Sequence, residues 1–320
     1  MSHPANPDGV TPGGGSVASV APGGGPIASI SPGGGPVTSV TPGGPARRTA
    51  VIGVSLKMYF GYERTLEWCR AVAEIASAHP AVQDGRIELF ILPAFPVLVE
   101  ATRILTPTRA GTGSQDLFWE DLGAYTGEVS GSMVAEIGGA YAEVGHAERR
   151  RIFGEDDDVI GLKTAAAYRN GLTPVFCVGE PAKGTAEEAI AYCAAEIDAV
   201  LNRAASIGRA GRTIVAYEPQ WAIGAPEPAT PEYINSVIAG LDAHLATREG
   251  QDDSRVIYGG SAGPGLLAQL DTAVAGLFLG RFAHDPAALS AILDEAVQRL
   301  EAPAGLGTVP QAQEAAEVSA

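Results

Sequence analysis

The chain has 320 residues, of which 46% are hydrophobic, and its formal net charge at pH 7 is −16. This composition provides for a substantial core and leaves no basic excess for binding nucleic acid or an anionic membrane. No run of about 18 apolar residues predicts a membrane span, and three cysteines without a CxxC pair or a signal peptide predict a reduced, cytoplasmic chain.

The two ends of the chain differ in composition from the rest. Residues 1–46 contain four Pro-Gly-Gly triplets spaced by ten residues and no aromatic residue, which predicts a disordered extension. A small solenoid is the alternative reading of such a repeat, but these units lack large apolar residues. A translation start set too far upstream is a further explanation. Residues 302–320 are rich in Ala, Glu and Gln, and we expect a second disordered tail there.

Strand and helix signals alternate between the tails, over residues 47–301. Short apolar runs predict strands at 51–54, 87–91, 110–114, 141–144, 174–178, 213–217, 256–258 and 276–279. Apolar spacing predicts helices at 64–78, 95–105, 157–169, 186–205, 231–247 (with Thr230 as N-cap), 266–270 and 286–300. About eight such units in about 255 residues predict one α/β domain, a closed (β/α)₈ barrel of the TIM type. An open doubly wound sheet is the alternative.

Three residues with acid–base or charge chemistry follow three different predicted strands. Lys57 follows the first strand, His146 the fourth and Glu218 the sixth. Singly, they read as a solvated lysine, a structural histidine and a loop carboxylate. At the C-terminal mouth of one barrel they would converge on one pocket. There a carboxylate can take a proton from a carbon beside a carbonyl, an imidazole can donate to the carbonyl oxygen, and an ammonium can stabilise the enediolate.

Four segments of the sequence then resemble the triosephosphate isomerase signatures. These segments, 124–130, 146–150, 217–224 and 258–261, have the family's order and spacing within about residues 49–301. The resemblance implies that Glu218 is the general base, that His146 is a neutral electrophile at a helix N-terminus, and that Lys57 supplies positive charge. We expect no cofactor and no metal ion, since no nucleotide motif or metal-ligand cluster competes for the site.

The resemblance also implies how the substrate, a small phosphosugar, is held. Glu148 matches a carboxylate of the family's active site, and residues 219–229 match the lid that excludes water. Backbone N–H groups at Gly224, near Ser261 and at Gly280 are expected to bind the phosphate. The loop Thr126, Gly127 and Glu128 matches the segment that enters a second subunit, so a homodimer is implied.

The sequence departs from the family around the expected substrate. The family reads Asn-Trp-Lys-Met-Asn where this chain has Ser55 to Tyr59, and a Gly-Gly pair is replaced by Gly280 and Arg281. Arg281 is expected to contact the phosphate; a surface arginine or a partner for an acidic neighbour is the alternative. Further replacements are Ala147 for Ser, 262–263 Ala-Gly for Val-Asn, and a lid in which Pro226 lacks a backbone N–H.

These departures suggest retained chemistry on a larger substrate. The loss of about two heavy atoms at Ser55 is close to the volume of an additional hydroxymethyl group. The pattern is similar to the family branch that converts L-erythrulose 1-phosphate to D-erythrulose 4-phosphate in polyol breakdown. Isomerisation of triose phosphates is the first alternative, and a phosphate-binding barrel without turnover is the second.

Overall fold

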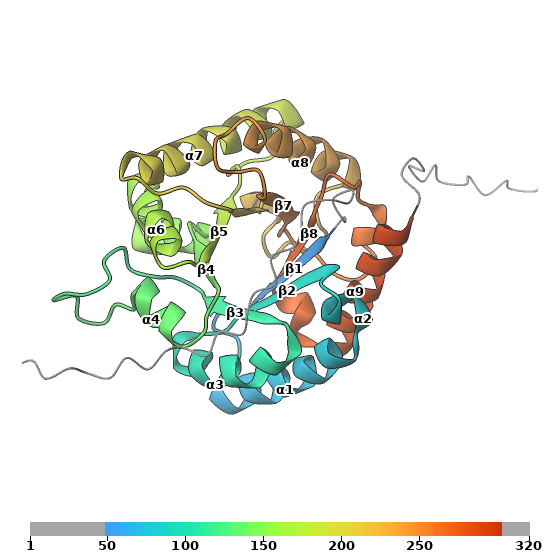
Figure 1. The fold of residues 1–320 in the computed structure, drawn as a ribbon. Helices are drawn as coiled ribbons and strands as arrows, with labels where there is room; N and C mark the ends of the chain where they lie inside the picture. The colour runs from blue at the N-terminus through green and yellow to red at the C-terminus, as the bar shows by residue number, and fades with distance from the viewer. Residues whose placement is uncertain (1–48, 303–320) are drawn as a thin grey trace, which may run out of the picture. The chain divides into compact units, whose positions relative to one another are not determined.

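Eight parallel strands close into a barrel in sequence order, with β1 paired to both β2 and β8 (Figure 1). The computed structural model describes residues 49–302. The strands are β1 (Ala50–Ser55), β2 (Ile87–Leu92), β3 (Gly111–Ser114), β4 (Tyr141–Val144), β5 (Thr173–Val178), β6 (Ile214–Tyr217), β7 (Arg255–Tyr258) and β8 (Gly276–Leu279). The closed order confirms the predicted (β/α)₈ barrel and excludes an open sheet. The predicted extension at 1–46 and nearly all of the predicted tail at 302–320 lie outside the described residues.

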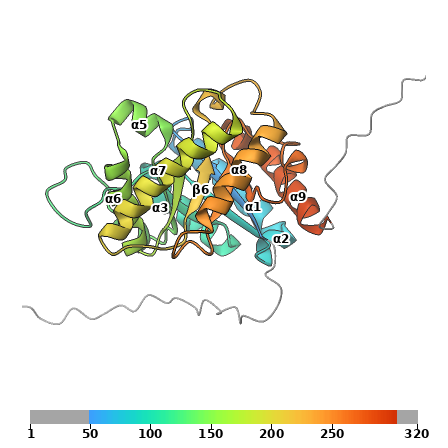
Figure 2. The ribbon, with the colours of Figure 1, turned by 90° about the horizontal axis from the view of Figure 1, so that it is seen from above.

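Helices surround the strands on the outside of the barrel (Figure 1). They are α1 (Tyr62–Ala78), α2 (Pro80–Gln83), α3 (Phe95–Leu105), α4 (Gly131–Glu136), α5 (Ala147–Phe153), α6 (Asp157–Arg169), α7 (Ala186–Ser206), α8 (Pro231–Leu245) and α9 (Pro286–Glu301). Short 3₁₀ helices are η1 (Thr106–Thr108), η2 (Gln220–Ala222), η3 (Leu267–Gln269) and η4 (Arg281–His284). The side view shows α5 at one end of the barrel (Figure 2).

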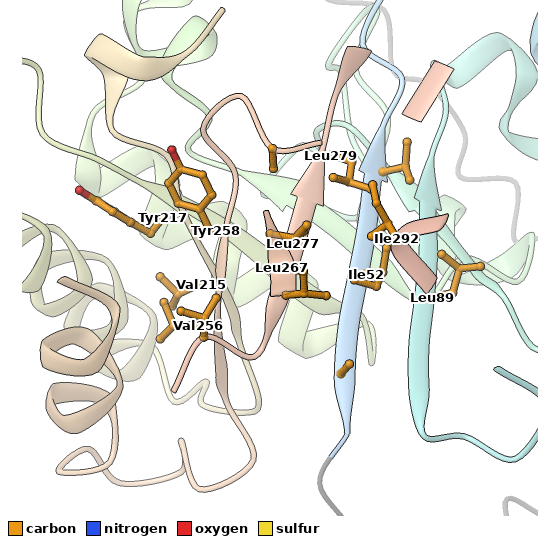
Figure 3. Close-up of a cluster of buried hydrophobic side chains, with 14 of the residues drawn as sticks. Ile52, Leu89, Val215, Tyr217, Val256, Tyr258, Leu267, Leu277, Leu279 and Ile292 are labelled. Carbon is orange, nitrogen blue, oxygen red and sulfur yellow. The ribbon is translucent and has the colours of Figure 1, made fainter. Parts of the chain in front are cut away.

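Side chains alternate along each strand between the helices and the barrel interior, as the pleat of a strand requires. The outward set packs beneath the helices and includes Ile52, Val215 and Leu277 (Figure 3). The inward set fills the barrel and is apolar at most positions: Val51, Phe90, Leu92, Val175, Cys177, Ile214, Ala216, Ile257 and Phe278. The strands are therefore covered on both faces, which explains why most of them are continuous apolar runs in the sequence; β3, with the sequence Gly-Thr-Gly-Ser, is an exception.

Most predicted elements are confirmed, with differences at their ends. The helices predicted at 95–105 and 157–169 have those bounds in the structure. Thr230 caps α8, because its side chain accepts a hydrogen bond from the Tyr233 N–H at 3.4 Å. That helix ends two residues earlier than predicted, at Leu245, and the predicted helix at 266–270 is the 3₁₀ turn η3. Apolar spacing did not predict α2, α4 and α5, which contain too few residues to show a helical period, although the family resemblance implied a helix that begins at His146.

Residues 49–302 contain neither a candidate membrane span nor a candidate metal site. None of the helices there is long and apolar enough to cross a membrane. No group of three or more His, Cys, Asp or Glu side chains in this range has an arrangement that could hold a metal ion.

Candidate active site

A cavity of about 290 Å³ opens at the C-terminal ends of the strands. Its lining includes eight of the predicted catalytic and substrate-binding residues: Ser55, Lys57, Glu148, Glu218, Gly224, Ser261, Gly280 and Arg281. These residues come from segments up to 226 positions apart in the sequence (281 − 55), and the closed barrel brings them together. The ninth, His146, is only 3% exposed and lies beside Glu218.

His146 is held in one protonation form by the start of α5. It is the N-cap residue of that helix, and its Nδ1 atom accepts a hydrogen bond from the Glu148 N–H at 3.1 Å. A ring nitrogen that accepts a hydrogen bond carries no proton. The bond therefore selects the neutral imidazole with its proton on Nε2, which is the form that can donate to a carbonyl oxygen.

Glu218 follows β6 and places its carboxylate next to that Nε2 atom. The Oε2 atom of Glu218 lies 3.4 Å from Nε2 of His146, and both atoms are buried without a hydrogen-bond partner among the described residues. The space for this carboxylate exists because residue 259 is glycine: a Cβ atom there would lie 2.5 Å from Cγ of Glu218. Buried polar atoms without partners are costly, so two of them aimed at one point indicate a binding site for a polar ligand.

Lys57 presents its ammonium group to the same cavity from the loop after β1. Its backbone φ is 48°, a left-handed conformation that a non-glycine residue rarely adopts outside functional sites. Gln115 supports this conformation by donating from Nε2 to the carbonyl oxygens of Lys57 and Leu92, at 3.1 and 2.9 Å. Sequence reasoning missed Gln115, which lies in the segment after β3 and belongs to no motif.

The charges around Lys57 keep it protonated. Burial lowers the pKa of Lys57, but the carboxylates of Glu218, Glu148 and Glu143 together raise it above its ordinary value. The Nζ atom also lies 3.1 Å from Oε1 of Glu148. Burial raises the pKa of Glu148, yet Lys57 and His146 lower it below its usual range. The site therefore contains a fixed ammonium group beside an ionised carboxylate.

The segment 219–229, predicted to be the lid, is tied to the loop and strand at β7. Ser261, whose own φ is 44°, places its Oγ atom 2.9 Å from the carbonyl oxygens of both Ala222 and Ala225. The Ala229 N–H donates to the Tyr258 hydroxyl at 3.1 Å. Pro226 has no N–H to offer, and Ser261 uses these neighbouring carbonyl groups instead.

Glu180, to which the sequence analysis assigned no role, anchors the start of the lid. It is 5% exposed and accepts hydrogen bonds from the hydroxyls of Tyr217 and Tyr233 and from Nε1 of Trp221. The Trp221 contact is 2.7 Å and the Tyr233 contact is 3.0 Å. One carboxylate thus joins β6, the lid and α8, and the available signal in the sequence was its position just after the strand predicted at 174–178.

Two arginines, Arg281 and Arg151, also line the cavity. Arg281, in η4, is exposed and forms no ion pair with a residue in the described range. Its guanidinium Nη2 would lie 3.6 Å from a Cβ atom placed on Gly224. Arg151, which was not predicted, also lines the cavity. Because Arg281 has no acidic partner and borders the glycine of the lid, its position favours the anion-binding interpretation over that of a structural ion pair.

A buried carboxyl group beneath the cavity was also missed. Glu143, on β4, is 3% exposed and accepts a hydrogen bond from the Ser55 hydroxyl at 2.8 Å. Burial raises the pKa of Glu143 to about 7, with His146 opposing the rise and Glu218 adding to it. A lone carboxylate inside the short strand sequence Tyr-Ala-Glu-Val was the available signal, because the alternation of the strand points that residue into the barrel.

The remaining predicted site residues, Thr126, Gly127 and Glu128, do not line the cavity. They belong to the loop between β3 and α4, which projects away from the barrel (Figure 1). Gly127 has a φ of 94°, which favours glycine at this turn.

A neutral imidazole, a carboxylate and an ammonium group around one cavity at the mouth of a (β/α)₈ barrel define an enzyme of the proton-transfer class. Comparison with known proteins agrees: a family model described as "Triosephosphate isomerase" matches residues 50–296. The chain therefore belongs to the triosephosphate isomerase family.

Three relatives indicate where the chain lies within that family. It is 56% identical over 249 residues to the L-erythrulose-1-phosphate isomerase of Pectobacterium atrosepticum, covering 78% of this chain and 96% of that protein. A protein of the same name from Rhizobium etli is 37% identical over 72% of this chain and 86% of its own length. The triosephosphate isomerase of Thermoanaerobacter pseudethanolicus is 36% identical over 62% of this chain and 82% of its own length.

Proposed function

We propose that this isomerase interconverts L-erythrulose 1-phosphate and D-erythrulose 4-phosphate without a cofactor. The observation that carries the chemistry is the pair of unpartnered buried atoms, His146 Nε2 and Glu218 Oε2, 3.4 Å apart beside the cavity. The observation that favours the tetrulose is the 56% identity to a protein named for that substrate. Both isomers share one enediol, so a single proton relay suffices.

The reaction then follows from the geometry of the three catalytic residues. Glu218 takes the proton from the hydroxyl-bearing carbon beside the carbonyl and returns it to the former carbonyl carbon. His146, neutral and with its proton on Nε2, donates to the carbonyl oxygen, then takes the proton of the neighbouring hydroxyl. Lys57 stabilises the negative charge of the enediolate. The carbonyl group moves by one carbon, and no atom is gained or lost.

The phosphate is expected to bind at the cationic side of the cavity. Arg281 offers a guanidinium group, and Gly224, Ser261 and Gly280 place backbone segments along the same lining. The lid would cover the substrate and exclude water, which protects the enediolate from loss of its phosphate. Glu148 fixes the Lys57 ammonium group rather than moving a proton itself.

Isomerisation of triose phosphates is a second candidate, favoured by the triosephosphate isomerases among the relatives and by the intact catalytic residues. A side-by-side assay of the purified full chain on L-erythrulose 1-phosphate and dihydroxyacetone phosphate separates the two. We expect kcat/KM to be about a hundredfold higher for the tetrulose, as a pocket with a polar recognition group can achieve. An equal or higher value for the triose would reject the proposal.

We also propose that the active form is a homodimer. Leu122 and Met58 are 88% and 92% exposed, and Phe153 and Tyr125 are also largely exposed. Three of these side chains lie on the loops that follow β1 and β3, Phe153 lies at the end of α5, and exposed large apolar side chains are typical of a subunit interface. The predicted interface loop at 126–128 directly follows Tyr125.

Free thiols at all three cysteines support the expectation of a reducing, cytoplasmic setting.

A further inference from the structure

Glu143 and Ser55 form a hydrogen bond across the barrel interior. Ser55 ends β1 and Glu143 lies on β4, and these strands are not neighbours in the sheet. Both residues belong to the inward-facing set, because side chains an even number of positions apart on a strand share a face. Val51 lies four positions before Ser55 and Tyr141 lies two positions before Glu143, and both pack inside the barrel. The pair therefore lies on the floor of the catalytic cavity, above the apolar filling of the barrel.

A carboxyl group at this position has a structural cost that packing does not explain. A carboxyl group can form several hydrogen bonds, and among the described residues the one to the side chain of Glu143 is the 2.8 Å contact that Ser55 donates. Its inward neighbours, such as Tyr141, Cys177 and Leu92, are mostly apolar. A well-packed apolar residue would be at least as stable there. Buried polar groups of this kind are found preferentially at functional sites.

The direction of the hydrogen bond decides what Ser55 can offer to a substrate. A serine hydroxyl has one hydrogen to donate and two lone pairs to accept with. The hydrogen of Ser55 is directed at Glu143, while Ser55 itself lines the cavity. Toward the cavity Ser55 is therefore an acceptor, and it requires a hydrogen-bond donor from the ligand.

The two candidate substrates differ in such a donor. L-erythrulose 1-phosphate carries a hydroxymethyl group on the reacting carbon, where dihydroxyacetone phosphate carries a hydrogen atom. Glu143 is also placed at the reacting end, since Lys57, His146 and Glu218 all act on it electrostatically. The hydrogen-bond donor that Ser55 requires from a ligand is therefore available in the hydroxymethyl group, which distinguishes the tetrulose from the triose.

Building on the proposed function, we propose that Ser55 accepts a hydrogen bond from the terminal hydroxyl of the four-carbon substrate, and that Glu143 is the positioning residue that keeps Ser55 in its accepting orientation. Ser55 touches the substrate, whereas Glu143 acts through Ser55. Together they select a ketose phosphate with a hydroxymethyl group over a triose phosphate. Catalysis itself remains with Lys57, His146 and Glu218.

A double-mutant cycle tests this arrangement. Wild type, Ser55→Ala, Glu143→Leu and the double variant are compared by kcat/KM on L-erythrulose 1-phosphate and on dihydroxyacetone phosphate. Each single variant is expected to lose roughly tenfold to a hundredfold on the tetrulose and less than about threefold on the triose. Because Glu143 acts through Ser55, adding Glu143→Leu to Ser55→Ala should cost nothing further on the tetrulose.

Three results would overturn the inference. If a variant of Glu143 loses kcat/KM equally on both substrates, Glu143 serves the shared chemistry or stability. If the ratio of kcat/KM for the two substrates does not change, Glu143 has no role in recognition. If the losses of the two single variants add in the double variant, Glu143 does not act through Ser55. Glu196→Gln is the matched control, because burial also raises the pKa of Glu196 to about 7 but that residue does not line the cavity. Glu143→Met, whose thioether is at most a weak acceptor for the Ser55 hydrogen, replaces the leucine variant should the latter fail to fold. A wild type inactive on the tetrulose would instead reject the proposed function.

Discussion

The Nε2 atom of His146 and the Oε2 atom of Glu218 face each other at 3.4 Å, and neither has a hydrogen-bond partner among the described residues. The imidazole is fixed by the N–H of Glu148 and the carboxylate by the space above Gly259. Such a pair is prepared to bind a ligand between a hydrogen-bond donor and a base, as an enediol mechanism requires.

Glu218→Gln removes the proposed base and retains the shape of the side chain. We expect kcat to fall by roughly 10²–10⁴ on both the tetrulose and the triose, since an amide cannot accept the carbon-bound proton. Initial-rate kinetics on both substrates measure the loss, with Glu136→Gln, an exposed carboxylate at the end of α4, as the matched control. Unchanged rates would mean that Glu218 is not the base, whereas a wild type and variant that are both inactive on either substrate would favour a barrel that binds phosphate without turnover.

Lys57→Ala removes the ammonium group that faces the reacting atoms. Turnover should fall by roughly 10²–10³, the usual effect of losing a preorganised charge at an oxyanion. Circular dichroism should be unchanged, because Lys57 lies in a loop and its Nζ contacts Glu148 at the cavity. Near-normal rates with either substrate would mean that the catalytic cavity has been misassigned.

Tyr258→Phe deletes the hydroxyl that accepts the Ala229 N–H at the end of the lid. The end of the lid should then be held less firmly, and kcat/KM should fall about tenfold with little change in Tm. Tyr168→Phe is the matched control, because that hydroxyl bonds to Thr213, outside the lid. Equal effects of the two variants would argue against a role for the Tyr258 contact in closure.

How far the sequence predicts this site depends on where each residue lies. Lys57, His146 and Glu218 follow strands and belong to motifs, so their convergence could be predicted once the barrel was recognised. Gln115 lies in a loop without a pattern. Glu143 was hidden because one polar residue in a four-residue strand is compatible with several registers, and only the closed barrel shows that it meets Ser55 across the interior.

Thermal unfolding should reveal the burial of Glu143. Its pKa is raised from 4.5 to about 7, so the folded chain keeps a proton that the unfolded chain releases between these values. The contribution of Glu143 to the free energy of unfolding therefore falls by on the order of 3 kcal/mol as the pH rises from about 4.5 to 7. We expect Glu143→Leu to reduce the fall in Tm between pH 5 and pH 8 by several degrees. An identical pH dependence in wild type and variant would contradict this.

The proposed subunit interface can be tested at Leu122, which is 88% exposed. Leu122→Asp should convert a dimer to a monomer, since an unpaired carboxylate in an apolar interface is strongly unfavourable. Light scattering after size-exclusion chromatography measures the mass. Ile207→Asp, at the C-cap of α7, serves as the control and should leave the mass unchanged. A monomeric wild type would reject the homodimer.

The hydrogen bond between Ser55 and Glu143 joins two strands, whereas the lid and the phosphate contacts belong to loops. On this proposal, substrate range depends on two strand residues, and turnover depends on their sequence neighbours Lys57 and His146 together with Glu218. Two side-chain replacements on a rigid scaffold could exchange one sugar phosphate for another while every loop keeps its length and course. Enzymes of this architecture would then diversify from the inside of the barrel, and a small library at positions 55 and 143 would be a compact starting point for isomerases of other ketoses.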